Sequence, residues 1–376
     1  MKVVLLNQIP EVNNKYTFSL AKAIQSNGVD IKVCGIADDD VSAYNVPFLN
    51  LFSSYSKEKG ILKKIISYYK SYKRLEKYCI EEKIDILHTQ WYIFSPLDYL
   101  FIKKIKRNGT KIVTTIHDLL PFNKKIYDYH YHKKIYRMAD AVVNQARSNE
   151  KELIEKFKVK KNNIIYTPHG HYMEYAEKAT REESREYLEI PPEKKVILFF
   201  GQIKKVKGID VLIEALKDVV SVHNDVICVI AGKVWKDDFT VYDDMIQSYG
   251  LQDYVSKFIR YIDDSEIKYF FNAADVVALP YRQIYQSGVV LLAYAYEKPV
   301  VATREGEFIT VVKDNETGKL VEAGNSKELA DAINWYLDNL DKANEFGRAG
   351  KEDLMVRLSW DTIAQKVTGR YRQILG

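Results

Sequence analysis

The chain has 376 residues, of which 47% are hydrophobic and 28% charged, which is typical of a globular protein of about two domains and excludes a disordered one. Its three cysteines show no metal-ligand spacing, and no apolar run approaches the roughly 18 residues of a membrane-spanning helix. The net charge is +5, but it is unevenly distributed. Residues 1–170 contain 29 Lys and Arg and 17 Asp and Glu, whereas the remaining residues contain 27 Lys and Arg and 34 Asp and Glu. A basic half therefore precedes an acidic half.

Strands and helices are predicted to alternate through the first half of the chain. An apolar run over Lys2–Leu6 predicts a strand, followed by a polar loop over Asn7–Asn14 and an amphipathic helix from Lys15 to about Asn27. Further strands are predicted at residues 31–34, 85–88, 111–117, 141–143 and 163–166. Strands separated by helices predict a parallel sheet that is covered on both faces.

Residues 171–194 are polar and charged and contain Pro191-Pro192, so we predict a connection with one helix there. The pattern then restarts, with strands at 196–200, 226–231, 255–260, 276–279 and 299–302, and helices at 209–220, 288–296, 326–339, 342–358 and 361–374. We therefore predict an α/β protein with two doubly wound, Rossmann-like domains, residues 1–170 and 195–358. Such sheets bind ligands at the carboxyl ends of their strands, so a cleft between the domains is the expected ligand site.

A lysine-rich loop, Gly201–Gly208, joins the strand at 196–200 to the next helix. It carries Lys204, Lys205 and Lys207, and the helix start adds unpaired N–H groups and partial positive charge. Lysine contributes a mobile full charge, so the loop predicts an anion site. A solvated loop that merely contains several lysines is the alternative.

A second loop, Tyr285–Gly288, follows the strand at 276–279 and opens another helix. Ser287 and Gly288 would bring backbone N–H groups close to a ligand, and an ordinary serine cap is the alternative. Two such helix starts in one domain favour a diphosphate, because charge-assisted hydrogen bonds are the stronger kind. Other predicted donor-binding residues at strand ends of this domain are Gly201, Gly232, Arg260 and Tyr261.

Histidines mark strand ends in the first domain. His117, followed by Asp118, is predicted to face the cleft, and His88 ends the preceding strand in the same way. His169 and Gln8 also follow strands and are predicted to line the acceptor side, with loop residues satisfied by their neighbours as the alternative. No helical His pair or cysteine partner accompanies them, so no metal is expected.

Two basic stretches rich in aromatic residues lie in the first domain. Lys57–Tyr78 carries eight basic and two acidic residues with apolar residues at helical spacing, and Lys124–Arg137 interleaves Lys with Tyr. Attachment to an anionic membrane is one interpretation, since each basic group contributes about 1 kcal/mol near anionic lipid. A solvated helix face is the other. Nucleic acid is not favoured, because no recognised fold motif accompanies the charge.

Several segments resemble the retaining GT-B glycosyltransferases of family 4, also described as glycosyl transferases group 1. The likeness covers nearly the whole chain and is most specific from residue 196 to residue 322. In the first half, Thr115–Asp118 resembles the sugar-facing histidine of the family. In the second half the likeness rests on Phe199–Asp210, Ala274–Pro280, Lys298–Thr303 and Thr317–Val321.

The resemblance implies a nucleotide-diphosphate sugar on the C-terminal domain and a glycan or lipid-linked acceptor on the N-terminal domain. It also implies a metal-independent reaction without a further cofactor, and a last helix, residues 361–376, that completes the N-terminal domain. Lys207 matches the diphosphate-binding lysine of the family, and we prefer Lys204 to Gln202 as its basic partner. With His117, these two lysines form the implied catalytic set.

The chain departs from the family at its donor contacts. Ile284 and Leu292 occupy the positions of the usual two glutamates, and Thr310 replaces a later one. Gln286-Ser287-Gly288 resembles instead a minority Gln-Ser-Gly variant, in which Gln286 would contact the sugar and backbone N–H groups would hold phosphate. The glycine-rich loop after the first strand is replaced by Asn7–Asn14.

The expected function is transfer of a hexosyl group, with retention of configuration, in polysaccharide or cell-envelope biosynthesis. A cytoplasmic protein is expected, attached peripherally to the inner face of the plasma membrane if the basic stretches bind lipid. The missing glutamates leave open a weak or inactive homologue that acts as a partner or chaperone subunit. A sugar-nucleotide epimerase is a third hypothesis, although it would require acidic groups for general acid–base catalysis.

Overall fold

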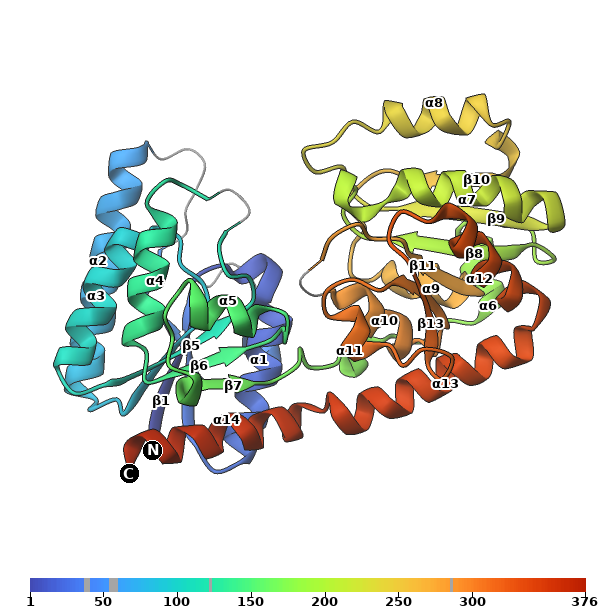
Figure 1. The fold of residues 1–376 in the computed structure, drawn as a ribbon. Coiled ribbons are helices and arrows are strands. Elements are labelled where there is room, and N and C mark those ends of the chain that lie inside the picture. The colour runs from blue at the N-terminus through green and yellow to red at the C-terminus, as the bar shows by residue number, and fades with distance from the viewer. Residues whose placement is uncertain (37–40, 54–59, 122–123, 285–286) are drawn as a thin grey trace. The chain divides into compact units, whose positions relative to one another are not determined.

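The structure is a computed structural model that describes residues 1–36, 41–53, 60–121, 124–284 and 287–376. The chain divides into two compact units, one formed by residues 1–170 and 358–376 and the other by residues 171–357 (Figure 1). Each unit contains one sheet of parallel strands with helices packed on it. The predicted pair of Rossmann-like folds is confirmed.

The first unit is built on a seven-stranded parallel sheet in the order β3-β2-β1-β4-β5-β6-β7. Neighbouring residues of β1 point to opposite faces, so that Val3 and Leu5 pack in one apolar cluster and Val4 and Leu6 in the other. Burial on both faces is expected of a parallel sheet covered by helices. The strands are β1 (Lys2–Asn7), β2 (Asp30–Gly35), β3 (Phe48–Asn50), β4 (Ile86–Thr89), β5 (Lys111–Ile116), β6 (Ala141–Asn144) and β7 (Ile164–Tyr166).

The helices of the first unit form two layers (Figure 1). One layer consists of α1 (Pro10–Ser26) and α14 (Trp360–Leu375), and the other of α2 (Ile61–Glu81), α3 (Ser95–Arg107), α4 (Asp128–Met138) and α5 (Asn149–Glu155). Because α2, α3 and α4 each lead from one parallel strand to the next, all three begin at the carboxyl edge of the sheet. Their first turns therefore lie along the edge where ligands bind in such folds.

The second unit is built on a six-stranded parallel sheet in the order β10-β9-β8-β11-β12-β13, with β8 between β9 and β11. Its strands are β8 (Lys195–Phe200), β9 (Val226–Ala231), β10 (Val255–Phe258), β11 (Val276–Leu279), β12 (Val300–Thr303) and β13 (Gly318–Val321). Its helices are α6 (Arg181–Tyr187), α7 (Ile209–Val222), α8 (Thr240–Ser248), α9 (Ile267–Ala273), α10 (Gly288–Ala295), α11 (Phe308–Val311), α12 (Ser326–Asp338) and α13 (Leu340–Arg357).

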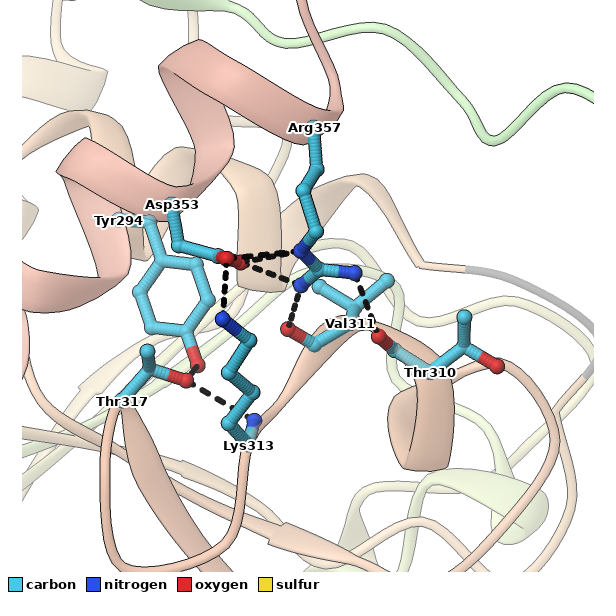
Figure 2. A network of polar contacts seen from close by, with 7 residues as sticks. All are labelled: Tyr294, Thr310, Val311, Lys313, Thr317, Asp353 and Arg357. Carbon is cyan, nitrogen blue, oxygen red and sulfur yellow. Dashed lines mark hydrogen bonds and ion pairs between the residues drawn. The ribbon is translucent and has the colours of Figure 1, made fainter.

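A polar network fixes the end of α13, where the chain leaves the second unit (Figure 2). The Arg357 guanidinium donates to the carbonyl oxygens of Thr310 at 3.1 Å and Val311 at 3.2 Å. It also pairs with Asp353, which forms a second ion pair of 2.7 Å with Lys313. Because the last carbonyls of a helix lack partners within it, this arginine stabilises the end of α11 as well as that of α13.

The elements differ from the prediction at a few places. Helix α1 begins at Pro10, so the predicted loop over Asn7–Asn14 is wrong, and proline at the first helical position accounts for this start. The strand β3 was not predicted, because three residues carry too little pattern to stand out. By contrast, the one helix predicted within residues 171–194 is present as α6.

Candidate functional site

Glycines shape the loop between β8 and α7 at the carboxyl edge of the second sheet. Gly208 has a φ of +67°, and a Cβ there would overlap the carbonyl oxygen of Pro280, so glycine allows this helix start to approach the end of β11. A Cβ on Gly232, directly after β9, would likewise overlap the carbonyl oxygen of Gly201. The loops that follow β9, β8 and β11 are therefore in direct contact.

The turn that opens α10 lies beside this loop. Ser287 caps the helix, because its hydroxyl accepts a hydrogen bond from the N–H of Val289 at 3.2 Å. A Cβ on Gly201 would lie 3.4 Å from the side chain of Val289, so α10 begins at Gly288 against the end of β8. The two helix starts predicted to bind phosphate are thus neighbours. Gln286, the predicted sugar contact, lies outside the described residues.

Lys207 and Tyr281 lie between these two helix starts. Nζ of Lys207 is 3.7 Å from the centre of the Tyr281 ring, which is buried directly after Pro280. Burial, and to a smaller extent the charge of Lys204, lowers the pKa of Lys207 to about 7. Lys204 lies 5.9 Å from the ring of Trp235. An ammonium partly removed from water is suited to bind a phosphate, whose negative charge would raise this pKa again.

Arg260 and Tyr261 follow β10, the edge strand, which is separated from β8 by β9. The Arg260 guanidinium forms hydrogen bonds of 2.6 and 2.8 Å with the carboxylate of Glu266. These bonds, with one from the Tyr187 hydroxyl, lower the pKa of Glu266 to about 2. The charge of Arg260 is therefore already balanced within the unit, whereas Tyr261 is exposed.

His117 lies after β5 in the first unit among aromatic rings. Its imidazole stacks on Trp91 with ring centres 4.7 Å apart, and its Nε2 is 3.1 Å from the side-chain oxygen of Gln90. Tyr16 contacts the imidazole edge-on. Burial lowers the pKa of His117 to about 3, so its ring is neutral near pH 7. Asp118, the next residue, is half-buried.

His88 and His169 occupy different surroundings. His88 is fully buried, with one ring nitrogen 2.5 Å from the Tyr371 hydroxyl and the other 2.7 Å from that of Thr115. It ties β4 to α14 and has no ring nitrogen left for an acceptor, so the structure places it in the core rather than at a ligand-binding edge. His169 is half-buried and packs 4.9 Å from Tyr16, and burial lowers its pKa to about 4.

A buried carboxylate that was not predicted lies beside Gln8. Asp98, in the first turn of α3, accepts hydrogen bonds from the hydroxyls of Tyr68 and Tyr72 and from the N–H of Phe94. Burial raises the pKa of Asp98 to about 6 in spite of these bonds. The Gln8 amide is 2.7 Å from the Tyr72 hydroxyl, so it belongs to this internal network. The sequence feature that could have indicated this network is the pair Tyr68 and Tyr72, which are four residues apart and therefore lie on the same face of α2.

The two basic stretches largely form α2 and α4 on one face of the first unit. The first turns of α2 expose Ile61 by 77%, Leu62 by 76% and Ile66 by 54%, and Ile126, before α4, is fully exposed. Packing against the core begins at Tyr68. Lys57 and Lys59 lie outside the described residues. Across the described ranges, no helix combines the length and the apolar character needed to cross a membrane.

Two family models match the chain in succession. The model of Glycosyltransferase Family 4 matches residues 14–175, and the model of Glycosyl transferases group 1 matches residues 180–353. The first match lies mainly in the first unit and the second lies within the second unit.

Individual relatives and solved structures are more distant. The chain is 29% identical to D-inositol 3-phosphate glycosyltransferase of Corynebacterium aurimucosum over 242 residues, 62% of this chain and 56% of that protein. It is 31% identical to phosphatidyl-myo-inositol mannosyltransferase of Mycobacterium leprae over 182 residues, 48% of this chain and 47% of that protein. It therefore spans about half the length of these relatives. The structure of HepE of Anabaena in complex with UDP is similar with a TM-score of 0.79 at 18% identity, covering 99% of this chain and 100% of that one, which shows the fold.

Proposed function

We propose that this chain, which belongs to the glycosyl transferases of group 1 and family 4, transfers a sugar from a nucleoside diphosphate to a hydroxyl group of an acceptor. The observation that carries the proposal is the meeting of two helix starts around Lys207 and Tyr281 at the carboxyl edge of the second sheet. N–H groups at helix starts and a lysine ammonium are suited to bind a diphosphate. Gly201 and Gly232 would complete this donor site through their backbones.

The departing diphosphate is the chemical centre of the proposed reaction. When its bond to the sugar breaks, negative charge accumulates on the phosphate oxygens, and Lys204, Lys207 and the first N–H groups of α10 would stabilise that charge. This supports a reaction that needs neither a metal ion nor a further cofactor. Retention of configuration is carried over from the family resemblance. The departing phosphate takes the proton of the attacking hydroxyl while the new glycosidic bond forms on the same side of the sugar.

His117 is proposed to position the sugar. Its neutral imidazole is held between Trp91 and Gln90, which suits an uncharged ligand better than a phosphate. Because the side chain is buried, the contact to the sugar is expected from the main chain at the end of β5. Asp118 and His169 remain the candidates for the acceptor side.

A lipid-linked acceptor would account for the exposed start of α2. Its first turns combine the exposed apolar residues Ile61, Leu62 and Ile66 with Lys63 and Lys64. An apolar strip among lysines is the pattern of a helix that lies in the surface of an anionic bilayer. One relative is named for phosphatidyl-myo-inositol, which makes an anionic lipid a reasonable acceptor class to test. Peripheral attachment to the inner face of the plasma membrane follows as part of the proposal.

Binding of nucleotides tests the donor site directly. Calorimetric titration of the full chain with UDP, GDP and ADP should show binding of one of them, with UDP first because the related fold of HepE was solved with it. Lys207→Ala should abolish or strongly weaken this binding. Lys205→Ala is the matched control, because Lys205 lies in the same loop but is exposed, and it should bind normally.

Failure of the wild-type chain to bind any of the three nucleotides would overturn the proposal. The inactive partner protein would then be preferred, which the replacement of the usual glutamates by Ile284 and Leu292 already favours. An epimerase would instead bind the sugar nucleotide and convert its sugar without any acceptor, which product analysis would reveal.

A further inference from the structure

We propose that Tyr281 is a positioning residue whose ring holds the ammonium of Lys207 at the phosphate-binding edge without neutralising it. The inference rests on the proposed donor site, and it adds a residue that the family resemblance did not identify. A ring differs from a carboxylate in this role, since it attracts a cation through its quadrupole and carries no net charge. The charge of the protonated lysine therefore stays available to a diphosphate.

The ring is a fixed support. Tyr281 is completely buried, and its carbonyl oxygen accepts a hydrogen bond of 2.7 Å from the Thr303 hydroxyl at the end of β12. Its ring packs on that of Phe308 with centres 5.3 Å apart. Tyr281 is thus anchored to the neighbouring strand and to α11, whereas Lys207 reaches it from the loop after β8.

The charges around Lys207 support this role. Among the described residues, no acidic side chain forms an ion pair with Lys207, and Lys204 is a like charge beside it. Asp210 is nearby on α7 but is paired with Arg282 at 2.5 Å. The ring of Tyr281 is therefore the group that attracts the ammonium before a ligand arrives. A carboxylate in its place would compete with the phosphate for the same charge.

The ring also affects the protonation of Lys207. Burial lowers the pKa of this lysine to about 7, and the ring, which favours the charged form, opposes that effect. Burial raises the pKa of the Tyr281 phenol well above its usual value, so the ring carries no charge of its own near neutral pH. Loss of the ring should therefore lower the pKa of Lys207 further, so that nucleotide binding weakens at a lower pH than in the wild type.

Three replacements separate the ring from its packing. Tyr281→Phe keeps the ring and should retain nucleotide binding. Tyr281→Leu should weaken binding of the nucleotide found in the panel of UDP, GDP and ADP by about five- to tenfold near neutral pH. It should also shift the decline of binding with rising pH to a lower pH. Pentafluorophenylalanine at this position keeps shape and packing but reverses the charge distribution of the ring, and it should behave like leucine.

A double-mutant cycle provides the decisive control. In the Lys207→Ala background, Tyr281→Leu should cause little additional loss of binding, because the lysine through which the ring acts is gone. Equal nucleotide binding by Tyr281→Leu and the wild type would overturn the inference. Normal binding by the protein with pentafluorophenylalanine at position 281 would also overturn it, and this second test applies even if the leucine variant does not fold. If the wild type binds no nucleotide, the donor site itself fails, which is a different outcome.

Discussion

Gly170 lies so close to the indole ring of Trp360 that a Cβ at position 170 would overlap it. Gly170 is the last residue of the first segment of its unit, and Trp360 is the first residue of α14, which returns to that unit. Trp360 also packs on Tyr16 of α1, with ring centres 5.2 Å apart. The chain therefore leaves and re-enters this unit at two points that touch, and glycine makes their contact possible.

We expect Gly170→Ala to destabilise the first unit by about 1–3 kcal/mol, because the added methyl group must displace the indole ring. Urea unfolding followed by tryptophan fluorescence measures the change. Gly369→Ala is the matched control. Gly369 lies on α14, the helix that also carries Trp360, and a Cβ at position 369 would meet no atom within 4 Å. Alanine in a helix should stabilise the control by up to about 1 kcal/mol. Equal stability of the two variants would contradict the tight contact.

Gly208→Ala should abolish nucleotide binding and destabilise the second unit. Its Cβ would overlap the carbonyl oxygen of Pro280 and push the start of α7 away from β11. Gly250 has nearly the same φ, +66° against +67°, but open space around it. Gly250→Ala should therefore cost only the backbone strain, about 1–2 kcal/mol, and leave nucleotide affinity unchanged. Calorimetry with thermal unfolding of both variants tests whether close approach is what Gly208 provides.

The stability of the first unit should fall in acid because of His88. Its pKa is about 3 in the folded chain against 6.5 in the unfolded chain, so folding favours the neutral ring. The stability contributed by this difference is complete above pH 6.5 and is lost as the pH falls toward 3. The full loss corresponds to at most about 5 kcal/mol. His88→Gln should flatten the profile measured by urea unfolding. His130→Gln, on the exposed face of α4, should leave it unchanged.

Membrane attachment should depend on the first turns of α2. Replacing Ile61, Leu62 and Ile66 together by serine should abolish flotation with anionic vesicles. Burial of each of these apolar side chains in lipid would stabilise the bound state by about 1.5–3 kcal/mol. Their exposure means that the fold should survive. Ile80→Ser, at the other end of the same helix and 51% exposed, should float normally. Binding of the triple variant at wild-type level, or insensitivity of flotation to salt, would contradict a lipid-facing helix start.

Most of the fold could be predicted from apolar runs between helical segments. Strands such as β8 and β9 are continuous stretches of buried residues, which is the strongest pattern a parallel sheet leaves in a sequence. Short elements such as β3 could not be found, because their place in the sheet depends on pairing with β2 and not on local pattern.

The candidate site could be predicted only in part. Lys207 and Ser287 could be proposed from the sequence because each lies between a predicted strand and a predicted helix, which is a property of the local sequence. Tyr281 was not predicted, because its contact is with a lysine from a different loop. His88 also lies near the end of a strand, yet nothing near it in the sequence indicates that Tyr371 covers it. For both Tyr281 and His88, the surroundings of the side chain depend on contacts with segments that are distant in the sequence.

The hydrogen bond between His88 and Tyr371 has a consequence for synthesis of the protein. Residues 171–357 form the second unit and can complete their sheet as soon as they leave the ribosome. The first unit is made earlier, but one face of its sheet lacks α14 until the final helix has been translated. The first unit therefore cannot complete its fold before α14 has been made, and Tyr16 and its apolar neighbours lack that cover in the meantime.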